Sequence, residues 1–144
     1  MSERAHREVV SYVRRSARMN PSQARAWEEY ADRWVVRVQA RELSTSVSPD
    51  ARVDWAAAFG RNAPLVVEIG SGNGEALVAL AAAHPGADVV AFEVFAPAVA
   101  STLSRIARSG ITNVRRVVAN GSEGLDHLFA MLAISRSAFE SWLF

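Results

Sequence analysis

The residues with the clearest chemical potential surround a glycine-rich turn that follows an acidic residue, Glu68. Glycines at alternate positions permit positive φ and let the backbone approach a ligand closely. An Ala/Leu-rich stretch ending at Ala83 follows the turn, and the N-terminus of such a helix offers unpaired N–H groups to a polar ligand. The sequence therefore predicts a ligand-binding turn that comprises Gly70, Ser71, Gly72, Asn73 and Gly74.

Two further polar features occur where later strands are expected to end. Glu93 lies near the end of the next apolar run, where a carboxylate can accept hydrogen bonds from both ribose hydroxyls of a nucleoside. Asn120 and Gly121 follow the third apolar run and indicate a turn, where a side-chain amide could read the edge of an adenine. Because ligands bind beyond the carboxyl ends of parallel strands, we expect these groups to meet in one nucleoside site.

The glycine spacing bears on which nucleoside cofactor would bind. Dinucleotide-binding enzymes favour G-x-G-x-x-G, because a pyrophosphate must sit at the start of the helix. This chain has G-x-G-x-G preceded by an acid, a variant similar to the first motif of the class I S-adenosylmethionine (SAM) methyltransferases. Their cofactor has no phosphate but carries an amino group and a sulfonium, which nearby acids would suit. NAD binding, or a structural turn with two incidental acids, is the weaker alternative.

The elements expected to position these groups alternate between strand and helix. Apolar runs bounded by turn residues indicate buried strands, and Pro or Gly marks the helix ends. This alternation, with short connections, predicts a parallel α/β sheet with right-handed crossovers. The expected strands are Leu65–Ile69, Asp88–Val94 and Val114–Val118, and the expected helices are Pro21 into the thirties, Val53–Phe59, Gly74–Ala83, Ala96–Ser109 and Glu123–Leu132.

Composition narrows the class of protein. The 144 residues suggest one domain, and an apolar fraction of 50% permits a real core. The absence of cysteine excludes disulfides and thiolate metal sites, and the histidines are too scattered for us to expect a metal. The apolar runs are too short to span a bilayer, and charges stand where a signal peptide would be apolar. We therefore expect a cytoplasmic protein with no membrane partner.

Charge is distributed unevenly along the chain. Residues 1–61 carry 11 arginines and 8 acidic residues, whereas residues 62–144 carry 5 arginines and 7 acidic residues. A basic front half favours an anionic partner such as nucleic acid, although a solvated helix surface would give the same pattern. The expected RNA contacts are the arginines that cluster in the leader, Arg14, Arg15 and Arg18.

Other prominent side chains are expected to have structural roles. Trp27, Tyr30 and Trp34 could stack on nucleobases, but their helical spacing favours packing in a core. Arg115 and Arg116 are adjacent in a predicted strand, so we expect one of them to face solvent without a special role.

Four separated segments of the chain resemble motifs of one protein family, and they occur in the same order as in that family. They are SYVRRSARMNPSQARAWEEY, EIGSGNGEAL, AFEVFAPAV and GITNVRRVVANGSEGL, and together they are similar to the bacterial tRNA methyltransferases that make 7-methylguanosine. The resemblance, over roughly residues 8–129, implies a Rossmann-like class I methyltransferase that binds SAM and acts on tRNA. It implies that Glu68 is the first cofactor acid and Glu93 the ribose-binding acid. Asn120 stands where many members have Asp, and Ala17 where Gly is common.

The end of the chain departs from that family. After about Phe129 the family continues with another strand and a P-D-P-W segment that supplies groups around the target guanine, whereas this chain runs AMLAISRSAFESWLF. The resemblance therefore assigns no catalytic residue. We interpret residues 1–61 as a basic leader with helices, 62–129 as a SAM-binding half-domain with about three strands, and 130–144 as a divergent tail.

This interpretation leaves three functions open. The leading one is a tRNA (guanine-N(7)-)-methyltransferase that is shortened or frame-shifted at its C-terminus. The others are a non-catalytic SAM- or RNA-binding remnant that acts with a partner, and a small-molecule methyltransferase. Class I methyltransferases, as the resemblance implies, place their first strand at the centre of a larger sheet. Here Leu65–Ile69 would become an edge, so we expect self-association, low stability and no methylation of tRNA by this chain alone.

Overall fold

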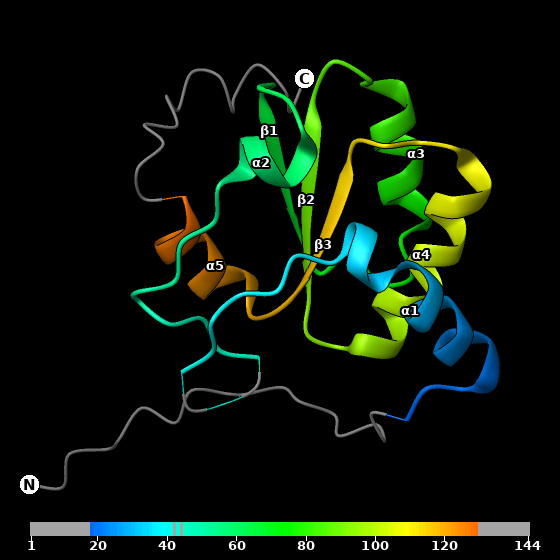
Figure 1. Ribbon diagram of the computed structural model, residues 1–144, viewed down its shortest axis with the longest axis horizontal. Helices are drawn as coiled ribbons and strands as arrows, with labels where there is room; N and C mark the ends of the chain where they lie inside the picture. Colours follow the sequence, from blue (N-terminus) through cyan, green and yellow to red (C-terminus); the bar gives the residue numbers. More distant parts are fainter. Residues whose placement is uncertain (1–17, 42, 44, 130–144) are drawn as a thin grey trace, which may run out of the picture.

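The protein forms a three-layer, Rossmann-like α/β structure around a small parallel sheet (Figure 1). The computed structural model describes residues 18–41, 43 and 45–129. Three strands, β1 (Leu65–Ile69), β2 (Asp88–Glu93) and β3 (Val114–Val118), pair in the order β1-β2-β3. The helices are α1 (Pro21–Trp34), α2 (Trp55–Phe59), α3 (Glu75–Ala83), α4 (Ala96–Ser109) and α5 (Gly121–Leu128).

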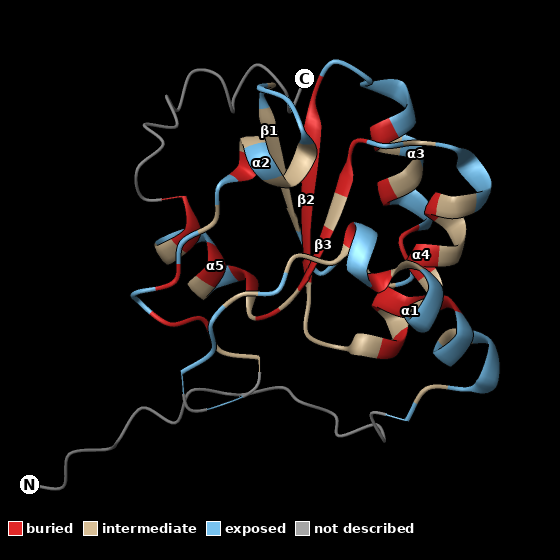
Figure 2. Ribbon diagram, in the orientation of Figure 1, coloured by how far each residue is buried: buried red, intermediate tan, exposed pale blue. Residues whose placement is uncertain are grey.

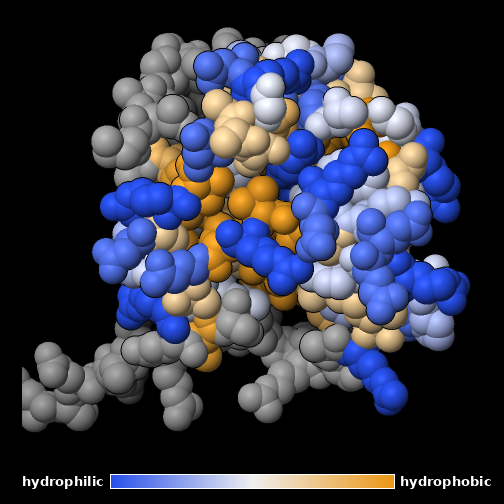
Figure 3. Space-filling model, in the orientation of Figure 1, coloured by the Kyte–Doolittle hydropathy of each residue, from blue (hydrophilic) through white to orange (hydrophobic). Residues whose placement is uncertain are grey.

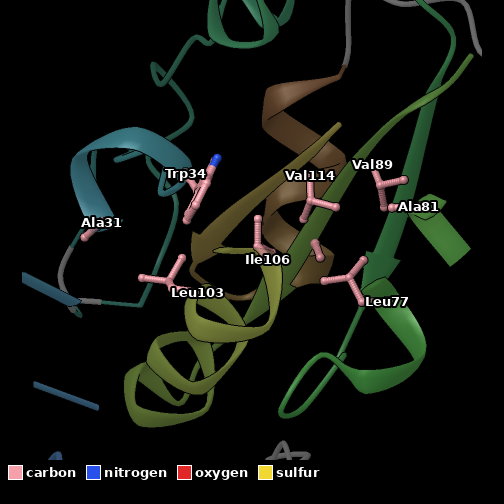
Figure 4. Packing of buried hydrophobic residues seen from close by; sticks show 9 residues of the cluster. Ala31, Trp34, Leu77, Ala81, Val89, Leu103, Ile106 and Val114 are labelled. Carbon is pink, nitrogen blue, oxygen red and sulfur yellow. The ribbon is translucent and has the colours of Figure 1, made fainter. Parts of the chain in front are cut away.

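The first face of the sheet is covered by α1, α3 and α4 (Figure 1). Leu77 of α3 and Leu103 of α4 are fully buried against Val89 and Val114 of the sheet (Figure 4). Trp34 at the end of α1 joins the same cluster, so the helix of the basic leader packs on α4 and shares its core.

The opposite face is covered by α2 and α5 (Figure 1). Val90 and Phe92 of β2 point to this side, since successive strand residues alternate between faces. Trp55 of α2 stacks on Phe129, with ring centroids 5.2 Å apart and planes 3° from parallel. Because both faces are covered, the central strand β2 is buried along almost its whole length (Figure 2).

Several helices begin just after residues whose side chains accept hydrogen bonds from the unpaired N–H groups of the first turn. Asn20 and Gln23 form a capping box at the start of α1, as a polar residue before Pro21 predicts. Asp54 caps α2, which therefore begins at Trp55 and is shorter than predicted. The predicted start of the last helix was wrong by two residues, because Asn120 accepts hydrogen bonds from two amides of the first turn and α5 begins at once, at Gly121.

The two edges of the sheet differ. Beyond β3, the segment after α1 extends the ladder through a parallel bridge between Val35 and Arg116, with Val36 N donating to Arg116 O at 2.9 Å. Within the described part of the chain, β1 pairs only with β2, and Ile69 is 52% exposed. The predicted edge at β1 is therefore present among these residues.

The amino ends of the strands are fastened by polar side chains. Asn113, just before β3, donates through Nδ2 to three carbonyl groups, those of Ala81, His84 and Ala87, at 2.9–3.1 Å. Asp88 at the start of β2 is buried and pairs with Arg61 at 2.7 Å. These contacts connect the end of α3 to the starts of β2 and β3.

The described surface is mixed in character. Figure 3 shows hydrophobic residues gathered near the centre of one face, with hydrophilic residues on either side. Among the described residues, no helix is both long enough and apolar enough to cross a membrane.

Candidate cofactor site

The glycine turn joins β1 to α3 at the carboxyl end of the sheet. Its three glycines all adopt positive φ, +73° at Gly70, +55° at Gly72 and +80° at Gly74, a region that L residues rarely occupy. The loop is anchored where Gly70 N donates to Phe92 O of β2 at 2.9 Å. The turn thus has the backbone conformation for which the sequence required glycine.

The glycines differ in what surrounds them. A Cβ at Gly70 or Gly72 would meet nothing within 4 Å, so the backbone at these positions borders open space. A Cβ at Gly74 would lie 2.5 Å from Oγ1 of Thr102, which is buried in α4. Gly74 therefore permits close packing of two helices, whereas Gly70 and Gly72 leave room beside the loop for a ligand.

Glu93 at the end of β2 faces this loop. Its Oε2 accepts a hydrogen bond from Gly72 N at 3.1 Å, and its Oε1 accepts one from Phe95 N at 3.2 Å. The carboxylate is only half-buried, so it retains a face toward solvent. The structure brings together the acid and the glycine turn that the sequence placed in one site.

Glu68 lies one strand away on the same side of the sheet. It pairs in register with Ala91, which in turn pairs with Arg116 on β3, so the three residues form one row across the strands. Burial raises the pKa of Glu68, and the positive charge of Arg116 offsets part of that rise. Ala91, with its small side chain, lies between Glu68 and Arg116 in this row, and the charge of Arg116 acts on Glu68 across it.

Arg116 was missed by the sequence interpretation. It is fully buried, donates through Nη1 to Ser71 Oγ and through Nη2 to Gly72 O, the latter at 3.3 Å. Desolvation lowers its pKa to about 10, although the charges of Glu93 and Glu68 act in the opposite direction. Arg115 is half-exposed on the opposite face of the sheet, where it packs over the ring of Phe59 at 4.8 Å. Of the two arginines, Arg115 is therefore the one that reaches solvent, whereas Arg116 is enclosed. Only the register of β3 against β2 could have revealed the buried arginine.

Asn120 and Gly121 lie after β3 at the same end of the sheet. Asn120 Oδ1 is occupied in capping α5, accepting from Ser122 N at 3.0 Å and Glu123 N at 3.2 Å. A Cβ at Gly121 would lie 2.6 Å from Cγ2 of Ile69, so this glycine allows α5 to approach β1. Their placement beside an adenine stays a prediction.

The remaining predicted residues fall into two groups. Arg18 is exposed just before α1, whereas Arg14 and Arg15 lie outside the described residues, as does the segment 130–144. Trp34 is buried, and Trp27 and Tyr30 pack against the same cluster, with the Tyr30 ring tilted 32° to that of Trp34 at a centroid distance of 5.2 Å, which confirms core packing. No group of three or more metal-binding side chains occurs in the described parts of the chain.

This arrangement defines a class of protein, an α/β fold with a glycine loop after the first strand and an acid at the end of the second that accepts a hydrogen bond from that loop. Residues 62–139 match the model of the family described as "Putative methyltransferase". Since this match covers more than half of the sequence, the chain belongs to that methyltransferase family. Methyltransferases generally use SAM as the methyl donor.

Curated relatives with the same printed name resemble most of the chain. The tRNA (guanine-N(7)-)-methyltransferase of Cutibacterium acnes is 50% identical over 127 residues, which cover 88% of this chain and 46% of the relative. That of Paenarthrobacter aurescens is 44% identical over 94% of this chain and 44% of its own length. That of Burkholderia vietnamiensis is 37% identical over 125 residues, which cover 87% of this chain and 45% of the relative. The chain thus spans about half the length of these relatives.

A solved structure is also similar in part. It is a 16S rRNA (adenine(1408)-N(1))-methyltransferase from Catenulisporales acidiphilia, 26% identical with a TM-score of 0.42, and the match covers 58% of this chain and 41% of that one.

Proposed function

We propose that this chain carries the SAM-binding part of a tRNA (guanine-N(7)-)-methyltransferase. The observation that carries the proposal is the hydrogen bond from Gly72 N to the Glu93 carboxylate, which sets the acid directly against the glycine loop. The printed names of relatives up to 50% identical supply the substrate, a guanine in tRNA. Within the chain, residues 62–129 form the proposed cofactor-binding unit.

The residues present fit SAM better than a dinucleotide. Gly70 and Gly72 border open space, and Glu93 has a half-buried carboxylate that can accept hydrogen bonds from ribose hydroxyls. Glu68 and Glu93 add two acids to this end of the sheet against one buried arginine, which favours a cofactor with a net positive charge over one with a pyrophosphate. Asn73, Asn120 and Gly121 complete the proposed lining.

When bound, SAM supplies a methyl group on a sulfonium that a nucleophile can take by in-line displacement. The N7 atom of guanine has a free lone pair, so no strong base is needed to expose it. The contribution of this chain would be to hold the cofactor at Gly70–Gly74 and Glu93 in a fixed orientation, because positioning and electrostatics dominate such a reaction. None of the described residues is assigned a catalytic role.

The proposed macromolecular partner is tRNA. The leader is basic, and its arginine cluster comprises Arg14, Arg15 and Arg18. Arg18 is exposed, so it can contact a phosphate backbone. The other two arginines of the cluster, Arg14 and Arg15, are proposed contacts from their sequence alone.

The cofactor assignment is tested by titration calorimetry of the full chain with SAM and with NAD. Glu93→Ala should weaken SAM binding by about 1–3 kcal/mol, the cost of losing hydrogen bonds to a charged group. Glu28→Ala, which removes an exposed acid of α1, is the matched control and should bind like the parent. Unchanged affinity in Glu93→Ala, or tighter binding of NAD than of SAM, would contradict the assignment.

The substrate is tested separately by digesting tRNA after incubation with SAM and identifying the methylated nucleosides by mass spectrometry. We expect any methylated nucleoside to be 7-methylguanosine, and we expect this chain alone to form none. Methylation of another nucleoside, or of a small molecule in place of tRNA, would contradict the proposed substrate while leaving SAM binding intact.

A further inference from the structure

Arg116 is a cation enclosed beneath the glycine loop, although a long charged side chain is rarely buried completely. Its Nε has no hydrogen-bond partner, so the guanidinium is not fully compensated by its surroundings. A buried ion of this kind adds little net stability compared with an apolar residue of similar volume. Its main physical effect is therefore on the groups that it contacts.

Those groups belong to the cofactor loop. From β3, the side chain reaches the loop that follows β1, where it donates to Ser71 Oγ and to the carbonyl of Gly72. The path is open because Ala91, its register partner on β2, has a small side chain. The same Gly72 donates its amide to Glu93, so Arg116 and Glu93 hold opposite ends of one residue of the loop.

Charge reinforces this geometry. Glu93 on the neighbouring strand β2 and Glu68 on β1, one strand further, are the acids whose charges act on Arg116. Without the cation, two carboxylates would face the same end of the sheet with no opposite charge between them. Arg116 therefore places a positive charge near both acids while its guanidinium contacts the loop.

We propose that Arg116 is a positioning residue for cofactor binding, which acts through Ser71 and Gly72 to hold the glycine loop against the ribose-binding acid Glu93. This inference rests on the proposed function. Arg116 lies on the third strand and is fully buried, whereas the open space for a ligand lies beside Gly70 and Gly72. The inference is that Arg116 controls SAM affinity without contacting SAM.

The test compares SAM affinity and thermal unfolding in variants of the full chain. Arg116→Met should bind SAM at least about tenfold more weakly, as expected when charge-assisted hydrogen bonds are lost. Arg116→Lys, which restores the charge but not both contacts, should recover part of the affinity. The matched control is Arg115→Met, which removes the adjacent arginine and its hydrogen bond to Ala58 O on the opposite face. It should lower the unfolding temperature but leave SAM affinity unchanged.

A double-mutant cycle with Ser71→Ala separates positioning from general stability. If Arg116 acts through the loop, the effects of Arg116→Met and Ser71→Ala on SAM affinity should not add. Ser71→Ala leaves the apolar core intact, so it and Arg116→Lys decide the question if Arg116→Met fails to fold. Parental affinity in both of these variants would overturn the inference, whereas failure of the parent to bind SAM would overturn the proposed function itself.

Discussion

Gly74 is the position where a single added methyl group should do most damage to this fold. In Gly74→Ala the new Cβ would lie 2.5 Å from Thr102 Oγ1, well inside van der Waals contact. Thr102 is buried in α4, so it cannot simply rotate into solvent. The substitution adds overpacking of about 1–3 kcal/mol to a left-handed backbone cost of about 1–2 kcal/mol. The total is a large part of the roughly 5–15 kcal/mol by which folded domains are stable.

Gly70→Ala is the matched control for this prediction. Gly70 has a similar φ of +73°, but an added Cβ there would meet no atom within 4 Å. Gly70→Ala should therefore lower the free energy of unfolding only by the backbone cost. Urea unfolding followed by tryptophan fluorescence suits the measurement, because Trp34 and Trp55 are buried on opposite faces of the sheet. Adding Thr102→Ala to Gly74→Ala should restore part of the loss. Equal destabilisation by the two glycine substitutions would refute the reasoning, since the Thr102 contact would then be irrelevant.

Three further predictions concern charge and the sheet edge. Burial raises the pKa of Glu68, so the folded state binds this proton more tightly than the unfolded state and stability falls as pH rises above the ordinary value of 4.5. Glu68→Gln should therefore be more stable than the parent at pH 7 in urea titrations, and a gain that persists unchanged below pH 4.5 would contradict this. Ile69→Lys should reduce self-association through β1 in sedimentation velocity, whereas Leu43→Lys, at another exposed apolar residue, should not; equal association in parent and Ile69→Lys would exclude the edge. Replacing Arg14, Arg15 and Arg18 with Gln should flatten the salt dependence of tRNA binding because fewer counterions are released, and an unchanged slope would mean that the cluster is merely solvated.

The strands and most helices were predictable because their local signals agree with their packing. β1, β3 and α4 have the predicted bounds. Pro64 and Gly70 flank β1, Pro97 and Gly110 mark the ends of α4, and β3 ends just before the Asn120-Gly121 turn. The meeting of Glu93 with the glycine loop was also predictable, because parallel strands bring their carboxyl ends to the same edge. These features depend on short-range pattern and on one general property of parallel sheets.

The burial of Arg116 depends instead on how three strands pair. A pair of arginines in a strand gives no sign of which will be buried, and the answer requires the register that places Ala91 between Glu68 and Arg116. Asn120 was similarly ambiguous, because the same residue type favours both a turn and a helix cap. The structure resolves it as a cap, since its Oδ1 accepts from the first turn of α5.

The contacts of Asn113 bear on how such a sheet can evolve. Its amide holds the carbonyls of Ala81, His84 and Ala87, so strand register is set at the end remote from the glycine loop. Changes in the loop that keep its three glycines, such as at Asn73, therefore leave these contacts of Asn113 in place. The two ends of the same three strands can thus vary separately, one in its loop and the other in the polar contacts that fasten the strand starts.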